Sequence, residues 1–448
     1  MAQLDPRPSR AAALLLALLV MAVVGAAQAE AAGWVPGPTP IIGRRGPTPV
    51  AGAVTFYGRG FGHGVGMSQY GARGRATAGQ LMPTILAHYY QGTTIGPLST
   101  PNPVIRVLVL DKFPATAAAP LTMHGRGGTW TVSGVAKTFP KDAVLRLIPT
   151  LASGSVSWRL RVLAVDGTVL HDASSTGAFI VSPAQAASLL QLNSKPSSFD
   201  TYRGTLRVIA GSASAAVTVV NTLPLESYLR GVVPSEMPAA WATEALKSQA
   251  VVARGYADRR IKPGIGTYDV KDDTSSQVYL GFENEKSTTD AAISATKDLV
   301  VKNGTAVADT LFHSTGGTAT ENNENVFVSD AGDIVVSPVT YLRGSSDPAP
   351  DGTPYDSTSP WLHWNTASHT VAELSAWFGS DARTNVGTLQ ALDLRNRGVS
   401  GRLISVTLIG SAGTKTVSGN LFRSVYNAHR PAGDPLFRAN AFALSPLP

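Results

Sequence analysis

Residues Gly231 to Pro238 read GVVPSEMP and precede the best helical pattern of the chain. It places one carboxylate, Glu236, in an apolar turn bracketed by prolines. Burial among apolar neighbours disfavours an ionised carboxylate and raises its pKa, which suits a general acid. The alternative is a glutamate that interacts with the positive N-terminal end of the following helix. The turn alone leaves both interpretations open.

The residues that follow this turn predict the best helix of the chain. From Pro238 to Arg260, small and apolar side chains recur at helical spacing. The helix carries Lys247 and Gln249, which could reach the same cleft as Glu236. Exposed helical lysines and glutamines are commonly only solvated, so their position alone does not assign them a role.

The rest of the chain predicts a β-rich α+β protein. It contains 44 Gly and 30 Pro but only 15% charged residues, which favours many strands and turns over a helical bundle. Alternating apolar and polar residues predict half-buried strands, and short helical patterns lie between them. The expected strands are 104–110, 144–148, 158–163, 205–221 and a pair within 401–420; the expected short helices are 83–90, 290–297 and 371–379.

A hairpin is predicted between strands 299–302 and 306–312. The dipeptide Asn303-Gly304 favours a two-residue type I′ turn, in which both central residues need positive φ. This places His313 at the exit of a strand, next to Ser314 in the sequence FHSTGGT. A structural histidine and one that contacts a ligand are equally consistent with this position.

The sequence GRGFGHGVGMSQYG, residues 58–71, has glycine at every second position from 58 to 66. Such a run lets backbone amides approach a ligand closely and places His63 in the opening, with Ser68, Gln69 and Tyr70 as further candidate contacts. Its spacing fits neither a dinucleotide fingerprint nor a nucleophile elbow. The alternative is a tight multi-turn loop that contains an incidental histidine.

Residues 1–29 read as a secretory signal, with Arg7 and Arg10 before an apolar run that ends in an A-x-A site at Ala29. We expect cleavage after Ala29. The alternative is an uncleaved membrane tether, for which the apolar run is short. Residues 30–52 are rich in Pro and Gly and predict an extended linker. The body of the protein is therefore expected outside the cytoplasm, in contact with the cell wall.

Composition excludes several kinds of chemistry. The absence of cysteine removes thiol nucleophiles, disulfides and thiolate-bound zinc. The eight histidines show no metal-binding spacing, although His63 and His313 could converge in space, and we expect neither metal nor cofactor. A net charge of +7 without a basic cluster suits an anionic wall polymer or membrane surface and does not indicate nucleic acid.

Together these stretches resemble the SpoIID/LytB (stage II sporulation protein D) domain family. The resemblance covers most of residues 55–440 and implies a SpoIID-like domain over 53–445. This domain would comprise a motif segment at 53–92, a β-rich lobe or insertion at 100–222 and a catalytic core at 223–445. The matching stretches are 225–238, 244–251, 276–279, 312–317 and 62–72.

Two departures from the family pattern stand out. The GHGVGMSQYG segment usually lies at the C-terminal end of the family domain, so its early position here resembles a circular permutation. Some family members resemble zinc proteins with cysteine ligands near the FHS position, and this chain has no cysteine. The resemblance therefore does not carry a metal over to this chain.

The resemblance implies a lytic transglycosylase. Such enzymes cut peptidoglycan glycan strands without stem peptides, between N-acetylmuramic acid and N-acetylglucosamine, and leave 1,6-anhydro ends. It implies Glu236 as the catalytic acid with support from Lys247 and Gln249. Tyr279 and His313 match further motif positions expected to line the cleft. The other expected substrate contacts are His63, Ser68, Gln69, Tyr70 and Ser314.

Two other functions stay open. The LytB part of the family name suggests a non-catalytic glycan-binding module that recruits or activates a cell-wall amidase. In that case Glu236 would be a structural or sugar-binding residue. A serine hydrolase that uses Ser314 or Ser68 is less consistent with the sequence, because it lacks a nucleophile elbow and an evident acid.

Overall fold

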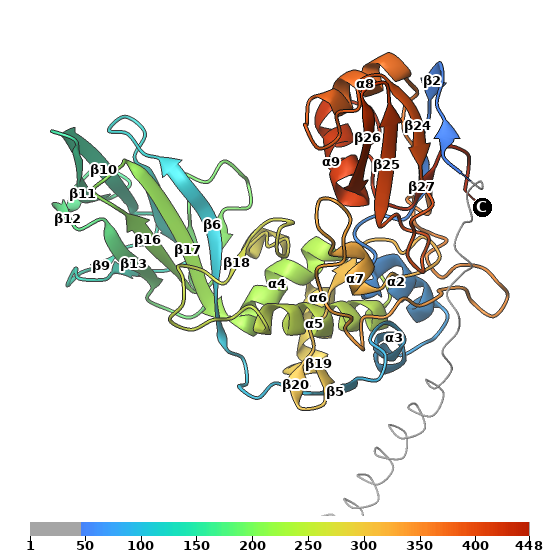
Figure 1. Cartoon of the computed structure of the whole chain (residues 1–448). Helices are drawn as coiled ribbons and strands as arrows, with labels where there is room; N and C mark the ends of the chain where they lie inside the picture. The colour runs from blue at the N-terminus through green and yellow to red at the C-terminus, as the bar shows by residue number, and fades with distance from the viewer. Residues whose placement is uncertain (1–45, 448) are drawn as a thin grey trace, which may run out of the picture. The chain divides into compact units, whose positions relative to one another are not determined.

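The computed structural model describes residues 46–447, which form two compact units (Figure 1). Among the described residues, unit 1 comprises 46–94 and 311–447, and unit 2 comprises Ile95–Thr310. The predicted signal at 1–29 and the linker up to residue 45 lie outside the described residues.

Two antiparallel sheets form the β-rich part of unit 2. The larger has the order β18-β6-β17-β16-β13-β8-β9, in which only β18 runs parallel to its neighbour β6, and the smaller has the order β12-β11-β10-β7-β14-β15. The predicted strands at 104–110, 144–148, 158–163 and 205–221 are confirmed. The strands are β6 (Val104–Pro114), β7 (Leu121–Arg126), β8 (Trp130–Val132), β9 (Thr138–Phe139), β10 (Val144–Ala152), β11 (Ser155–Leu163), β12 (Val169–Ser175), β13 (Ala178–Pro183), β14 (Leu189–Gln191), β15 (Thr201–Tyr202), β16 (Thr205–Ala210), β17 (Ala216–Pro224) and β18 (Val270–Lys271).

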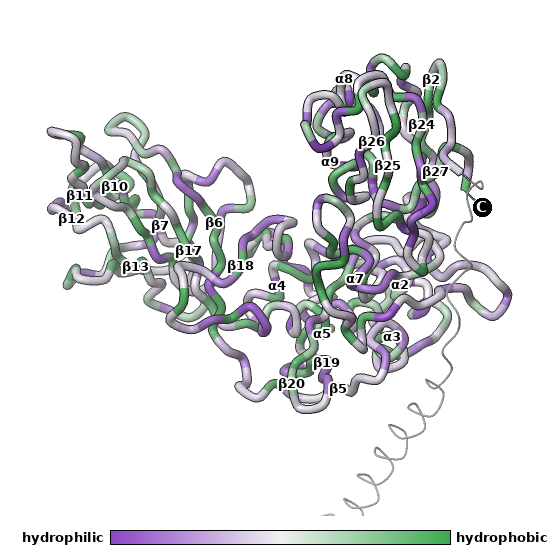
Figure 2. The backbone as a smooth tube through the Cα atoms, viewed as in Figure 1, coloured by the Kyte–Doolittle hydropathy of each residue, from purple (hydrophilic) through white to green (hydrophobic). Residues whose placement is uncertain are grey.

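Alternation along these strands builds a shared core. In β11, exposed and buried residues alternate so that Trp158, Leu160 and Val162 lie on one face. They join one apolar cluster with residues of the larger sheet, such as Val208 and Val219. Figure 2 shows the resulting mixture of hydrophobic and hydrophilic residues along the strands. Each fully buried aliphatic side chain contributes about 2 kcal/mol to folding.

The helices of unit 2 are α4 (Leu225–Glu236), α5 (Thr243–Asp258), α6 (Ser287–Ala295) and the short 3-10 helix η1 (Phe282–Asn284). Figure 1 shows α4, α5 and α6 gathered together. Helix α5 is the longest among the described residues, as the sequence predicted, but it begins at Thr243 and not at Pro238. The reason is a turn in which the Trp241 N–H bonds the Pro238 carbonyl, 3.0 Å away. Glu236 is also not in a turn, because it is the last residue of α4.

The hairpin that follows α6 differs from its prediction. Strands β19 (Leu299–Asn303) and β20 (Ala306–Val307) pair Asn303 with Ala306, so the two loop residues are Gly304 and Thr305. Of these only Gly304 has positive φ, at 61°, which is the requirement of a type II′ turn and not of type I′. The predicted strand at 306–312 also ends early, at Val307.

Unit 1 combines small sheets with helices. Its sheets have the orders β1-β24-β25-β26, β22-β3-β27, β2-β23 and β21-β4, and one apolar cluster around Phe56 and Phe422 forms a core. Helix α8 and the strand pair within 401–420 are confirmed, whereas α2 and α9 were not predicted. The elements are β1 (Thr48–Pro49), β2 (Ala53–Val54), β3 (Tyr57–Arg59), β4 (Met67–Ser68), α2 (Gln69–Thr77), α3 (Met82–Tyr89), β21 (Phe312–His313), α7 (Asn323–Val326), β22 (His363–Asn365), β23 (His369–Thr370), α8 (Val371–Gly379), β24 (Leu389–Asp393), β25 (Ser405–Gly410), β26 (Gly413–Ser418), α9 (Gly419–His429) and β27 (Phe442–Ala443).

These elements confirm the β-rich α+β fold class with a few short helices. Within residues 46–447, no helix has the length and apolar character that a membrane crossing needs.

Candidate functional site

Glu236 lies half-buried at the C-terminal end of α4, where Met237 turns to extended backbone. Its Oε1 accepts a 2.8 Å hydrogen bond from the backbone N–H of Val278. The segment that carries Val278 is held against α4 because Gly231 has no side chain. A Cβ at Gly231 would lie 2.6 Å from the Tyr279 ring. The Leu280 N–H then bonds the Gly231 carbonyl.

The charge of Glu236 raises the pKa of two tyrosines, Tyr228 and Tyr256, in addition to burial. Burial raises the pKa of Tyr228 well above its usual value, and the charge of Glu236 adds to this shift. Burial also raises the pKa of Tyr256, while the nearby Arg260 lowers it. The Tyr228 hydroxyl donates to Gln277, 3.2 Å away. Both phenols therefore stay protonated.

Sequence reasoning did not single out Tyr228, Gln277, Tyr256 or Arg260. A signal was available for two pairs. Tyr228 precedes Glu236 by about two helical turns on α4, and Tyr256 precedes Arg260 by one turn, so each pair lies along one face.

Lys247 and Gln249 lie on different faces of α5. They are two residues apart, which places them about 200° apart around a helix of 3.6 residues per turn. Lys247 is partly exposed and its Nζ pairs with Glu244, 2.7 Å away. Gln249 is fully buried. The expectation that both side chains reach one cleft is therefore wrong for this structure, and Gln249 could act only through its neighbours.

Tyr279 is buried beneath α4 and does not line a surface. It is 2% exposed, its hydroxyl donates to Asn221 at 2.9 Å, and its ring packs 5.1 Å from that of Tyr228. The predicted contact with substrate has no accessible surface to act through. Tyr279 positions its neighbour Val278 instead.

In unit 1 the structure brings His63 and His313 together, which confirms that they converge. Strand β4 runs parallel to β21, so that Ser68 is opposite His313. The two imidazole ring centres are 5.5 Å apart. His313 thus lies in β21 and not at the exit of the strand that follows Gly304.

Both imidazoles are held neutral. Burial, followed by the charge of Arg402, lowers the pKa of His63 to about 4. Burial also lowers the pKa of His313 well below its usual value, with the neighbouring His63 next in effect. The Val65 N–H donates to Nδ1 of His63, and Nδ1 of His313 lies 3.2 Å from the Val65 carbonyl. The neutral tautomers are therefore Nε2–H for His63 and Nδ1–H for His313. The described residues contain no group of three or more potential ligands for a metal ion.

The glycine loop is packed against the protein itself. A Cβ at Gly64 would lie 2.3 Å from the Arg402 guanidinium, and one at Gly66 would lie 2.0 Å from the Leu311 carbonyl oxygen. Both glycines have positive φ. The expectation that the loop amides hold a ligand is wrong for those already bonded within the protein. These are the N–H groups of Gly60, Phe61, Gly62, Val65 and Met67.

The remaining predicted contacts divide into buried and exposed residues. Ser68 is fully buried, and its Oγ caps α2 by accepting the N–H of Gly71 and also accepts that of Gly316. Gln69 is buried as well, whereas Tyr70 and Ser314 keep partly exposed surface. Ser68 therefore has a structural role and is not accessible as the nucleophile of a serine hydrolase.

A buried polar cluster of unit 1 was also missed. Asp347 accepts hydrogen bonds from Arg75 at 2.7 Å and Tyr89 at 2.6 Å. Burial, followed by the charge of Asp347, raises the pKa of Asp356 to about 6, although the carboxylate accepts the N–H of Gly317. These residues are scattered along the sequence, and no spacing indicates their contact.

The comparison with known families agrees with the unit 2 site. Residues 213–302, which contain α4, α5 and Glu236, match the family described as Stage II sporulation protein, SpoIID. The chain is 31% identical over 185 residues to the Amidase enhancer of Bacillus subtilis, covering 40% of this chain and 24% of the relative. It is 30% identical over 177 residues to the Stage II sporulation protein D of Bacillus subtilis, covering 36% and 47%.

A shorter match, 54% identical over 44 residues, joins the chain to the Stage II sporulation protein D of Bacillus amyloliquefaciens and covers 10% of this chain and 13% of the relative. The chain spans less than half the length of each of these relatives. The segment that holds Glu236, residues 213–302, is therefore similar to the SpoIID family.

Proposed function

We propose that this protein is an exported lytic transglycosylase that cleaves peptidoglycan glycan strands, with Glu236 as general acid. The observation that carries the proposal is the half-buried Glu236 carboxyl group, oriented by the Val278 N–H inside the SpoIID segment. One fixed oxygen sets the direction of the other, which a general acid needs to deliver its proton.

The reaction needs a single carboxyl group. Protonated Glu236 gives its proton to the glycosidic oxygen as the bond to the anomeric carbon breaks. The O6 hydroxyl of the same muramic acid attacks that carbon, and the Glu236 carboxylate accepts the O6 proton. The acid is thereby regenerated and no water is consumed. This differs from the glycosidases that need two carboxylates to activate water or form a covalent intermediate.

We also propose that residues 1–29 direct export and that the protein acts at the cell wall, where its substrate lies. The SpoIID-like domain would extend over 53–445 in a circularly permuted order. We further propose that the partly exposed His63, Tyr70 and Ser314 of unit 1 bind glycan through hydrogen bonds. His313, which is buried, would support His63.

The second candidate is a non-catalytic module that binds glycan and activates or recruits an amidase. The match to a relative named Amidase enhancer favours it. In that function Glu236 would bind sugar without transferring a proton. Cleavage by the purified chain therefore separates the two candidates.

The decisive experiment incubates the purified chain with peptide-free glycan strands and analyses the products by mass spectrometry. We expect fragments with 1,6-anhydro ends, and we expect Glu236→Gln to abolish them while retaining binding. The matched control is Glu373→Gln, which makes the same change at an exposed cap of α8. Ordinary reducing ends would indicate hydrolysis, and intact strands that are bound would favour the amidase-activating module.

A further inference from the structure

The net positive charge of the chain is concentrated in the β-rich part of unit 2. Residues 95–224, which form every strand of its two antiparallel sheets except β18, contain eleven lysines and arginines but only five acidic residues. The rest of the chain is nearly balanced, with 26 basic and 25 acidic residues. The fold therefore gathers a charge that is scattered as single residues along the sequence.

Three of these arginines lie on the outer face of the smaller sheet. In β11, Arg159 and Arg161 alternate with core residues, and β10 places Arg146 directly opposite Arg161. Figure 1 shows β10, β11 and β12 side by side. Next-nearest residues on one strand are about 6.6 Å apart, and directly opposed residues are about 5 Å apart. Opposed like charges destabilise a sheet, so folding alone does not explain the pair of Arg146 and Arg161.

One carboxylate offsets this charge only in part. Asp172 of β12 pairs with Arg159 and lies 3.5 Å from Arg161, and the two arginine side chains remain 62% and 38% exposed. The Nε of Arg161 has no hydrogen-bond partner among the described residues. Arg146 forms no side-chain hydrogen bond or salt bridge within the described part of the chain. The three arginines therefore leave an excess of two positive charges on this face.

A hollow of about 740 Å³ adjoins Arg146. Its floor consists of residues that point outward from three neighbouring strands, namely Thr122 of β7, Val144 and Arg146 of β10, and Leu163 of β11. Its one acidic lining residue is Asp142, whose sequence neighbour is Lys141. A polymer in this hollow would place its carbon atoms on Val144 and Leu163 and a charged group at Arg146.

We propose that this face of unit 2 binds a linear cell-surface polymer that carries closely spaced phosphodiesters. The planar donor fork of arginine matches the oxygens of a phosphate. A peptide-free glycan strand carries a carboxylate on only every second sugar, which is sparse for cations about 5–7 Å apart. A poly(glycerol phosphate) chain carries one charge for each three-carbon unit. The inference goes beyond the proposed function and does not depend on strand cleavage.

The test titrates the full-length chain with synthetic poly(glycerol phosphate) in a calorimeter, at about 50 and 200 mM salt. Arg146→Gln combined with Arg161→Gln is expected to weaken binding roughly tenfold at the lower salt concentration and to reduce the dependence of affinity on salt. Without polymer, this variant should melt at the same temperature as the wild type or higher, because it removes a pair of opposed like charges.

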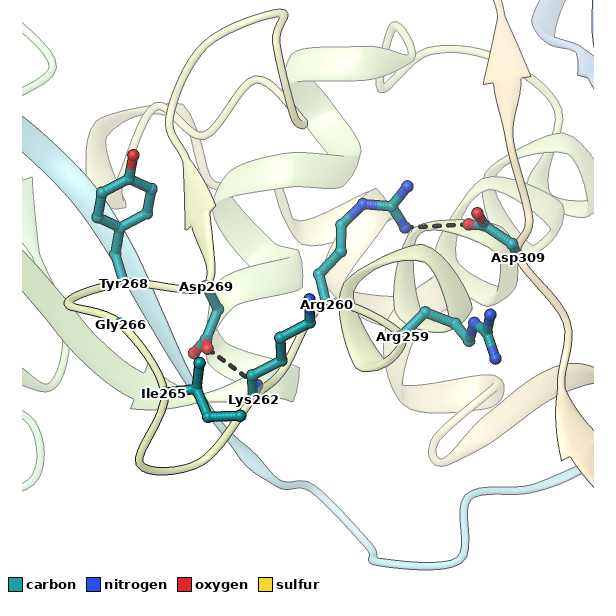
Figure 3. A pocket seen from close by; sticks show the side chains of 8 residues that line it. All are labelled: Arg259, Arg260, Lys262, Ile265, Gly266, Tyr268, Asp269 and Asp309. Carbon is teal, nitrogen blue, oxygen red and sulfur yellow. Dashed lines mark hydrogen bonds and ion pairs between the residues drawn. The ribbon is translucent and has the colours of Figure 1, made fainter. Parts of the chain in front are cut away.

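The matched control removes two other cations of unit 2. Arg259 and Lys262 border a cavity of about 410 Å³ beyond the C-terminal end of α5 (Figure 3). Neither forms a salt bridge or side-chain hydrogen bond with a described residue. Arg259→Gln combined with Lys262→Gln changes the net charge by the same amount. It should leave the affinity within about twofold of the wild type, because salt screens charges that do not contact the polymer.

Equal losses of affinity in the two variants would overturn the inference, because they would show attraction by the overall charge. Absence of binding to poly(glycerol phosphate) would also overturn it, as would equal binding of poly-γ-glutamate at the same charge concentration. A third contrary result is binding to phosphatidylglycerol vesicles but not to the soluble polymer, lost on Arg146→Gln and Arg161→Gln. That result would assign the face to a membrane surface.

Discussion

The backbone N–H of Val278 donates to the carboxylate of Glu236 across 2.8 Å, joining the segment after β18 to the end of α4. This bond exists because Tyr279, the next residue, packs into the space that Gly231 leaves open. The position of the proposed acid therefore depends on a glycine five residues earlier in the same helix.

Gly231→Ala tests this dependence. The new methyl group would meet the Tyr279 ring at 2.6 Å, so the segment at 277–281 must move. Overpacking of this kind costs about 1–3 kcal/mol, and we expect loss of strand cleavage beyond the loss of stability. Denaturant unfolding and product analysis measure the two effects. Gly379→Ala is the control, because nothing lies within 4 Å of its added Cβ. Full activity of Gly231→Ala would contradict the proposed positioning.

Tyr279→Phe distinguishes a structural tyrosine from one that binds substrate. The change removes the hydroxyl that donates to Asn221 and leaves that buried oxygen without this partner. We expect a loss of about 1–2 kcal/mol in the free energy of unfolding. We expect no change in the affinity for glycan strands, measured with the Glu236→Gln chain as background. A selective loss of affinity with unchanged stability would restore the role predicted from the sequence.

Asp356→Asn should stabilise unit 1 in a pH-dependent way. The pKa of Asp356 is raised from 3.8 to about 6, so ionisation above pH 6 costs the folded state free energy. The neutral amide avoids this cost, on the order of 2–3 kcal/mol from the pKa shift. We therefore expect a higher melting temperature for the variant at pH 7–8 and convergence with the wild type as the pH falls toward 4. Equal melting temperatures at pH 8 would refute the shifted carboxyl group.

For His63 we expect stability to change with pH in the direction opposite to that for Asp356. Its pKa is lowered from 6.5 to about 4, so the unfolded chain takes up a proton between these values while the folded chain does not. The stability from neutral His63 is complete above pH 6.5 and is lost as the pH falls toward 4. We expect His63→Asn to show a shallower fall in melting temperature over this range. An identical slope in both chains would show that His63 titrates normally.

The sequence predicted those features that depend on local pattern. Alternation predicted strands β10 and β11, and the short helix expected at 371–379 is α8. The predicted type of the turn at Gly304 was wrong. The pairing of Asn303 with Ala306 depends on the register of the two strands, which one dipeptide does not determine.

The candidate sites were predicted less completely, because their geometry depends on distant residues. Gly64 and Arg402 touch although they are far apart in sequence, so a loop that looks open in the sequence is filled in the fold. Tyr279 belongs to a recognisable motif, but the residue type alone does not show whether its side chain lines a cleft or is buried in the core. The role of Glu236 stays a prediction, and the convergence of His63 with His313 was predicted. The hydrogen-bond partners of these residues were not predicted.

The division of the chain has a consequence for its biosynthesis. Unit 2 is one continuous stretch of the chain. In unit 1, β4 can pair with β21 only after the chain has been synthesised as far as His313, which contacts Val65 across 248 positions. Because the ribosome synthesises the chain from its N-terminus, unit 2 has all its residues before unit 1 does. A released chain truncated after Thr310 should therefore resist protease over Ile95–Thr310 and leave the preceding segment open to digestion.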